Sequence, residues 1–207
     1  MNETTRTRRT LAGGGELVLC DGWLEGARPG LWEDLMEEIP WKQESFRMGG
    51  RVVLQPRLTA WVGDAEAVYR YSRRDFVPTP WTPALASLRE RLSRVEGALV
   101  NSVLCNLYRD GQDSMGAHAD DEPELGEDPT IYSLSLGATR RIRFWHALRS
   151  EPSFALDLKP GSLLIMRGAT QRFWRHGLSK TKRTVGPRIN LTFRQFIRSR
   201  STLRSLP

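Results

Sequence analysis

The feature that most constrains this 207-residue sequence is a series of short apolar segments, separated by turn residues, that begins after Gly97. Glycine or proline stands between most of them, and several alternate apolar with polar residues as half-buried strands do. The segments are 98–108, 130–136, 141–145, 154–158, 162–166 and 188–194. Many short strands at this spacing predict a β-sandwich or jelly roll built from the second half of the chain.

The first 97 residues have a mixed pattern of helices and strands. Thr82 followed by Pro83, with apolar residues at 85, 88, 92 and 95, predicts a helix that ends before Gly97. A shorter helix is expected over 31–39, because three apolar residues lie one turn apart and Pro40 follows. Strands are expected at 16–20 and 51–54, and the polar, glycine-rich residues 1–15 are expected to be a mobile tail.

We therefore expect a mainly β (α+β) chain that forms one structural domain with three parts. These parts are the tail 1–15, an N-terminal extension 16–97 and a jelly-roll (double-stranded β-helix) core 98–207. No apolar run approaches the ~18–20 residues of a membrane span, and the N-terminus lacks the apolar segment of a secretory signal. With only two cysteines, a cytoplasmic location is the simpler expectation, and nothing in the sequence requires more than a monomer.

Charge is distributed unevenly along the chain. Residues 140–207 contain 16 Lys and Arg against 2 Asp and Glu, whereas the first 139 residues contain 15 against 22. Phosphate groups attract such basic segments with little regard to base sequence. The charge therefore suggests an anionic partner such as nucleic acid, although a basic surface that only keeps the protein in solution is the alternative.

Two of the three histidines stand in a pattern typical of metal ligands. His118 and Asp120 are two residues apart, so on an extended segment their side chains share one face. His176 lies 58 residues later and is followed by Gly177. Two histidines and one carboxylate can occupy one face of an octahedral Fe(II) ion and leave the other positions open. The His-x-Asp pair alone is a weak signal, because it also occurs in solvated acidic loops such as the one around Asp120.

The segment 188–194 has one polar and one apolar face. Period-2 alternation places Arg188, Asn190, Thr192 and Arg194 on the polar face. Two arginines facing a protein interior are unfavourable unless they bind anions, and 2-oxoglutarate offers two carboxylates that match guanidinium groups. The alternative is a half-exposed strand with a hydrated basic face.

Together these motifs resemble the AlkB family of Fe(II)- and 2-oxoglutarate-dependent dioxygenases, which repair alkylated nucleic acid. The similarity extends from about Gln55 to Ile197. It is carried, in the family's order, by NLYRDGQDSMGAHADDE, SLSLGATRRIRFWH, GSLLIM, WRHGL and PRINLTFRQF. The HADDE stretch and the segment PRLTAWVGD are most similar to the DNA-repairing members of higher organisms.

The resemblance implies three groups of site residues. The catalytic metal ligands would be His118, Asp120 and His176. The residues around 2-oxoglutarate would be Asn106, Tyr108, Arg188, Asn190, Thr192 and Arg194, with Arg188 on the far carboxylate. A nucleotide-recognition lid in the N-terminal extension, together with the acidic stretch, would hold a flipped base through Arg57, Trp61, Tyr69, Arg70, Tyr71, Ser72, Asp121 and Glu122. Candidate phosphate contacts are Arg140, Arg141, Arg172, Lys180, Lys182 and Arg183.

The implied reaction is the oxidative demethylation of bases such as 1-methyladenine and 3-methylcytosine, with Fe(II), 2-oxoglutarate and O₂ required and formaldehyde released. Residues 48–51 (MGGR) lack the bulky aromatic residue that duplex-repairing members insert into DNA. Single-stranded DNA is therefore the expected partner, and duplex DNA or RNA are alternatives. Three other interpretations stay open: a related oxygenase acting on a protein or small molecule, a nucleic-acid-binding jelly roll with a degenerate iron site, and a zinc hydrolase.

Overall fold

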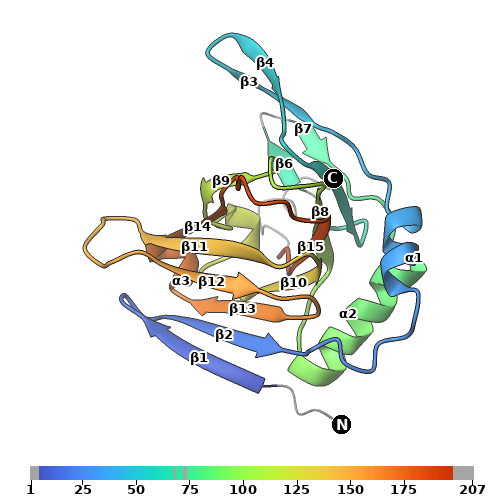
Figure 1. Cartoon of the computed structure of the whole chain (residues 1–207), viewed down its shortest axis with the longest axis horizontal. Helices are drawn as coiled ribbons and strands as arrows, with labels where there is room; N and C mark the ends of the chain where they lie inside the picture. Colours follow the sequence, from blue (N-terminus) through green and yellow to red (C-terminus); the bar gives the residue numbers. More distant parts are fainter. Residues whose placement is uncertain (1–4, 68, 72–73, 198–207) are drawn as a thin grey trace, which may run out of the picture.

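Two antiparallel sheets face each other in the computed structural model, which describes residues 5–67, 69–71 and 74–197, without the side chains of 46, 48, 69–71 and 74–76 (Figure 1). The larger sheet contains β1 (Thr5–Leu11), β2 (Gly15–Asp21), β13 (Leu163–Gly168), β10 (Ile131–Gly137), β15 (Arg188–Arg194), β8 (Ser102–Tyr108) and β5 (Leu58–Gly63), in that spatial order. The smaller sheet contains β12 (Phe154–Leu158), β11 (Arg140–His146), β14 (Trp174–Leu178) and β9 (Met115–His118). This mainly β architecture confirms the predicted jelly roll.

The remaining elements lie around the sheets. Two hairpins, β3 (Ser45–Met48) with β4 (Arg51–Leu54) and β6 (Tyr69–Tyr71) with β7 (Arg74–Phe76), lie near the same end of the molecule, and the first projects from the body (Figure 1). The helices are α1 (Leu31–Glu38), α2 (Pro83–Glu96) and the short α3 (Thr170–Phe173), and η1 (Pro123–Leu125) is a 3₁₀ turn. None of the described helices is long and apolar enough to cross a lipid bilayer.

Helix α2 forms where its capping residues predict it. The hydroxyl of Thr82 accepts a hydrogen bond from the Leu85 amide, and Gly97 ends the helix at φ 64°. Leu85, Leu88 and Leu92 are buried. They pack in one hydrophobic core with α1 and one face of the large sheet.

A second hydrophobic core fills part of the space between the two sheets. Strand β15 contributes to the first core through Ile189, Leu191 and Phe193. Because side chains alternate along a strand, the polar face of β15 therefore points between the sheets. This orientation places two arginines inside the protein, as the sequence predicts for an anion-binding strand.

Two expectations about the N-terminal part are wrong. Residues 5–11 are not a mobile tail, because β1 pairs with β2 over its whole length and Arg6 donates two hydrogen bonds to Glu96. Nor does an extension end at residue 97, since β1, β2 and β5 are strands of the large sheet itself. Six of the seven residues of β1 are exposed, so this strand has no apolar alternation for a sequence pattern to detect.

Candidate metal centre and adjoining pockets

The three predicted metal ligands meet between β9 and β14. His118 ends β9 and lies directly opposite His176 of β14, and Asp120 follows two residues after His118. The two imidazole centroids are 4.4 Å apart, and one ligand atom from each of the three residues lies within 4.8 Å of the others. Gly177 allows this close strand approach, because a Cβ there would lie 3.0 Å from two carbonyl oxygens of β9. Segments 58 residues apart in sequence are thus brought to one point.

The donor atoms fit a divalent metal. Oδ2 of Asp120 is buried without a hydrogen-bond partner and lies 3.6 Å from Nε2 of His176. Nδ1 of His118 is 3.0 Å from the carbonyl oxygen of Gly116, so a proton on Nδ1 leaves the Nε2 lone pair for a metal. Two imidazole nitrogens and one carboxylate oxygen are the donor set of Fe(II) sites with open positions.

The protonation states also suit metal binding. Burial lowers the pKa of His176 to about 4, although Asp120 opposes the shift, so its imidazole is neutral at neutral pH. Burial opposes ionisation of Asp120, but the positive charge of the neighbouring Arg194 outweighs it and the pKa of this carboxyl is lowered. A neutral imidazole and an ionised carboxylate are the forms that coordinate a cation.

A residue that the sequence analysis missed holds Asp120 in place. The amide N–H of Asp120 donates to Oε1 of Gln171 at 3.0 Å, and Gln171 is 1% exposed on the short helix α3. Nε2 of Gln171 faces the sulfur of Met166 at 3.7 Å. No motif marks this glutamine, because its role depends on α3 packing beside a loop some 50 residues earlier in the chain.

A small pocket of about 40 Å³ lies between the sheets beside the ligands. Its polar wall comes from β8 and β15, which pair so that Asn106 faces Asn190 and Tyr108 faces Arg188. The wall residues include Asn106, Tyr108, Ser133, Asn190, Thr192 and Arg194. The predicted cosubstrate residues are therefore gathered along one pair of strands.

Arg188 stands behind this wall as a buried cation. Its Nη2 donates to the Ser135 hydroxyl at 2.9 Å, its Nε has no partner, and its guanidinium carbon is 5.4 Å from the Tyr108 ring centroid. Burial lowers the pKa of Arg188 to about 10, so the side chain stays charged at neutral pH. A buried charge with unused donor capacity favours an anionic ligand here.

Arg57 and Arg194 also lie in this region. Arg57 is buried and its Nε donates to Oδ1 of Asn106 at 2.7 Å, so it contacts a residue that lines the small pocket. Arg194 donates to Asp120 and lies 3.5 Å from Glu122, so it joins the metal ligands to the acidic stretch.

An open cleft of about 600 Å³ adjoins the small pocket, and the two share Leu104 and Arg194. Half-buried Trp61 lines the cleft, with its ring centroid 5.6 Å from that of Phe196. Glu122 also lines it, and burial raises the pKa of this carboxyl although Arg194 opposes the shift. The three-ligand site thus lies where a small polar pocket meets a much larger cleft.

Comparison with known proteins identifies this arrangement. Residues 17–194 match the profile of the 2OG-Fe(II) oxygenase superfamily. The chain is 32% identical over 227 residues to "DNA oxidative demethylase ALKBH2" of Arabidopsis thaliana, covering 93% of this chain and 70% of the relative. This chain belongs to the AlkB family of dioxygenases.

Other relatives extend the comparison. The AlkB dioxygenase described here is 41% identical over 192 residues to "Alpha-ketoglutarate-dependent dioxygenase alkB homolog 3" of Bos taurus, and 43% over 175 residues to the Homo sapiens protein of that name. These matches cover 86% and 78% of this chain but only 65% and 59% of the relatives, so the chain spans less than two thirds of their length. The solved structure titled "The structure of OsALKBH1" has the same fold, with a TM-score of 0.60 and 20% identity over 91% of this chain and 100% of that one.

The structure separates the remaining predicted substrate residues. Of the two acidic residues expected beside the base, only Glu122 lines the cleft, whereas Asp121 is exposed and lies 3.5 Å from Arg175. Strand β6 consists of Tyr69, Arg70 and Tyr71, whose side chains are not among the described parts of the structure. Ser72 lies outside the described residues altogether. Their contacts with a base stay a prediction.

The predicted phosphate contacts of this AlkB dioxygenase fall into different environments. Arg140 is buried and donates to the backbone carbonyls of three residues, so its assignment as a phosphate contact is wrong. Arg141 forms a bidentate ion pair with Asp157, and Arg172 pairs with Glu127. The exposed members on the loop between β14 and β15 are Lys180, Lys182 and Arg183.

Proposed function

We propose that this chain oxidatively demethylates N-alkylated bases of the 1-methyladenine and 3-methylcytosine type in DNA, with RNA as a second substrate. The observation that carries the proposal is the metal-ligand cluster at the junction of a small polar pocket, with the buried Arg188 behind its wall, and a larger cleft lined by Trp61 and Glu122. Relatives named DNA oxidative demethylase support the choice of substrate. Fe(II), 2-oxoglutarate and O₂ are the required cofactor and cosubstrates.

Each part of the site has a role in this reaction. Bound Fe(II) would supply the oxidation of a methyl C–H bond by O₂, coupled to the conversion of 2-oxoglutarate to succinate and CO₂. His118, Asp120 and His176 hold the metal, and Arg188 binds the far carboxylate of the cosubstrate. The hydroxymethyl group left on the base nitrogen then leaves as formaldehyde: the C–N bond breaks, its electron pair returns to the ring nitrogen, and the hydroxyl proton is released, which restores the neutral base.

The cleft favours an alkylated base over a normal one. Methylation of a ring nitrogen blocks pairing and makes the base cationic, and both effects lower the cost of flipping it out of the stack. The Glu122 carboxylate lies in the cleft wall, where it attracts a positive charge more strongly than it would in bulk water. The face of Trp61 offers a stacking and cation–π surface to such a base.

Single-stranded DNA is the expected substrate form. The projecting hairpin turns at Gly49 and Gly50, which have φ values of 55° and 80°, and neither provides a side chain that could fill the gap left by a flipped base (Figure 1). We also expect a monomer in the cytoplasm. Both cysteines are free and buried, which suits a reducing compartment.

The test is a panel of methylated single-stranded and duplex DNA and RNA oligonucleotides, incubated with Fe(II), 2-oxoglutarate and ascorbate while formaldehyde is measured. Single-stranded DNA with 1-methyladenine or 3-methylcytosine should release the most formaldehyde, and the Asp120→Ala variant should release none while remaining folded by circular dichroism. Turnover of 2-oxoglutarate without formaldehyde from any oligonucleotide would instead indicate a protein or small-molecule substrate. Activity of Asp120→Ala would contradict the metal assignment.

A further inference from the structure

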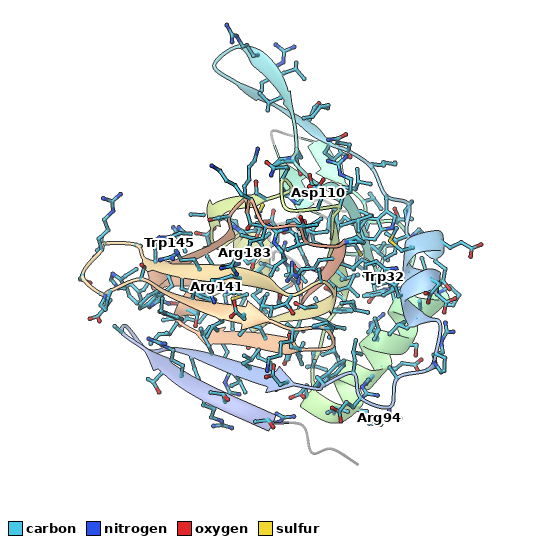
Figure 2. The ribbon with its side chains drawn as sticks, in the orientation of Figure 1. Trp32, Arg94, Asp110, Arg141, Trp145 and Arg183 are labelled. Atoms are coloured by element: carbon cyan, nitrogen blue, oxygen red, sulfur yellow. The ribbon has the colours of Figure 1, made fainter. Side chains whose placement is uncertain are left out.

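The outer face of the small sheet carries an aromatic and basic surface that the metal site does not use. Along β11, buried residues alternate with Arg141, Arg143 and Trp145, which point away from the protein interior. Trp145 is only partly buried on this outer face. Figure 2 shows Trp145, Arg141 and Arg183 on the same side of the molecule.

The neighbouring strands make this surface hollow. Trp145 pairs with Arg175 of β14, and Arg143 lies between Gly177 of β14 and Ala155 of β12. Glycine has no side chain and alanine only a methyl group, so little covers the flanks of Arg143. Two hollows result, of about 510 Å³ beside Trp145 and about 520 Å³ beside Arg143. The charged side chains that line the larger one are Arg140, Arg141, Arg143, Asp157, Lys180 and Arg183.

Arg143 lies between the two hollows, which together are called the trough below. It lines the basic hollow, and its guanidinium donates to the hydroxyl of Ser153, which lines the hollow beside Trp145. Acidic residues on the trough are Asp157, which is paired with Arg141, and Glu151. The trough therefore combines an aromatic face at one end with an excess of positive charge at the other.

The trough also begins next to the metal centre. Arg175 contacts Asp121, the residue after the ligand Asp120, and Ala117 at the trough's edge precedes the ligand His118. Strand β9 is the edge of the small sheet and is two strands from β11, a distance of about 10 Å. A polymer leaving the metal site across this edge would thus run directly onto the trough.

We infer that the trough binds the unpaired nucleotides that flank the lesion, with Trp145 stacked on a base and Arg143 and the exposed cations of loop 179–187 on phosphates. An indole face can stack only on a base that is not stacked in a duplex, so the occupant is a single strand. The exposed indole of Trp145 also favours nucleic acid over an acidic peptide, because a peptide carboxylate would need only the basic side chains of the trough. This inference rests on the proposed function for the lesion, but binding at the trough needs neither a lesion nor a metal.

The test uses metal-free protein and unmodified oligothymidylates of about 5 and about 15 nucleotides, with fluorescence anisotropy as the measure of binding. Wild type should bind the longer oligomer more tightly than the shorter one. Trp145→Ala should remove this gain and weaken binding of the longer oligomer about ten-fold, whereas Trp145→Phe should largely restore it. Arg143→Gln should weaken binding and reduce the slope of log K against log salt by about one.

The matched control is Arg94→Gln, which removes an exposed arginine from α2 on another side of the molecule (Figure 2). It should bind both oligomers as wild type does. Trp145→Ala and Arg143→Gln variants that fold and bind like wild type would overturn the inference. Binding of an acidic peptide, but not of oligothymidylate, to the trough would also overturn it. The two proposals can fail separately. If these variants lose oligomer binding but wild type demethylates no oligonucleotide, the proposed function is refuted and the inference that the trough binds single strands still holds.

Discussion

Gln171→Leu should weaken both the fold and the metal site. The substitution keeps a side chain of similar size but removes the oxygen that accepts the Asp120 amide at 3.0 Å. Leaving a buried N–H without a partner costs about 1–3 kcal/mol, a large share of the ~5–15 kcal/mol that stabilise a typical domain. With a urea m value of about 3 kcal/mol/M, the unfolding midpoint of the metal-free protein should fall by roughly 0.3–1 M.

The larger effect should be on metal affinity. The backbone amide of Asp120 is held by its hydrogen bond to Gln171, and Oδ2 of its carboxylate has no hydrogen-bond partner. Without the bond to Gln171, the Asp120 ligand can move. Loss of such an outer contact typically lowers metal affinity about 10–100-fold. Anaerobic titration with Fe(II) and 2-oxoglutarate, followed through the metal-to-ligand charge-transfer band, measures this affinity.

Two variants separate positioning from general destabilisation. Gln112→Leu also removes one side-chain hydrogen bond to a backbone group, at an exposed site, and should change stability by less than about 0.5 kcal/mol with no effect on metal affinity. Gln171→Glu keeps an acceptor for the amide and should retain part of the affinity. A Gln171→Leu protein with a lowered urea midpoint but a metal affinity within two-fold of wild type would refute the positioning role.

Three further predictions concern the cosubstrate, pH and strand preference. Arg188→Ala should raise the KM for 2-oxoglutarate roughly 10–100-fold, because a charge-assisted hydrogen bond to a buried carboxylate is lost, and an unchanged KM would exclude that role. Burial lowers the pKa of His176 to about 4 from its ordinary 6.5, so as the pH falls the unfolded state takes up the proton first. The free energy of unfolding of the metal-free protein should therefore fall by up to about 3 kcal/mol between pH 6.5 and pH 4. His176→Gln should flatten that dependence in urea titrations, and equal wild-type midpoints at pH 7 and pH 4 would contradict it. Met48→Phe should raise the ratio of duplex to single-strand activity in the formaldehyde assay, and an unaltered ratio would show that the hairpin does not decide it.

The parts of the fold that follow from local patterns were predictable from sequence. Thr82, Pro83 and Gly97 mark the ends of α2, and the strict alternation in 188–194 predicts a strand with one polar inward face. Strand β1 was not predictable in this way, because its stability comes from pairing with β2 and from the contact of Arg6 with Glu96. That information lies in the partner segments, not in residues 5–11.

The site shows the same division. A His-x-Asp pair and a distant histidine identify the metal ligands because coordination restricts the residue types and requires two ligands on one face of a segment. Gln171 carries no such restriction, since any side chain with a suitably placed acceptor could receive the Asp120 amide. Residue type alone therefore identifies the ligands but not the residue that positions one of them.

The positive charge of the C-terminal half has three different uses, and this limits what net charge can predict. Arg140, Arg188 and Arg194 are buried, where they bind backbone carbonyls, a hydroxyl and a ligand carboxylate. Surface arginines such as Arg141 are neutralised by carboxylates on adjacent strands. Among the described residues of this half, the cations that remain for a polyanion are concentrated beside Arg143 and on the loop 179–187, next to Trp145 on the outer face of β11. Nucleic-acid binding by the described residues of this half should therefore depend on a few side chains on the outer face of the small sheet. Its salt dependence should be far weaker than an excess of 14 basic over acidic residues after residue 139 would suggest.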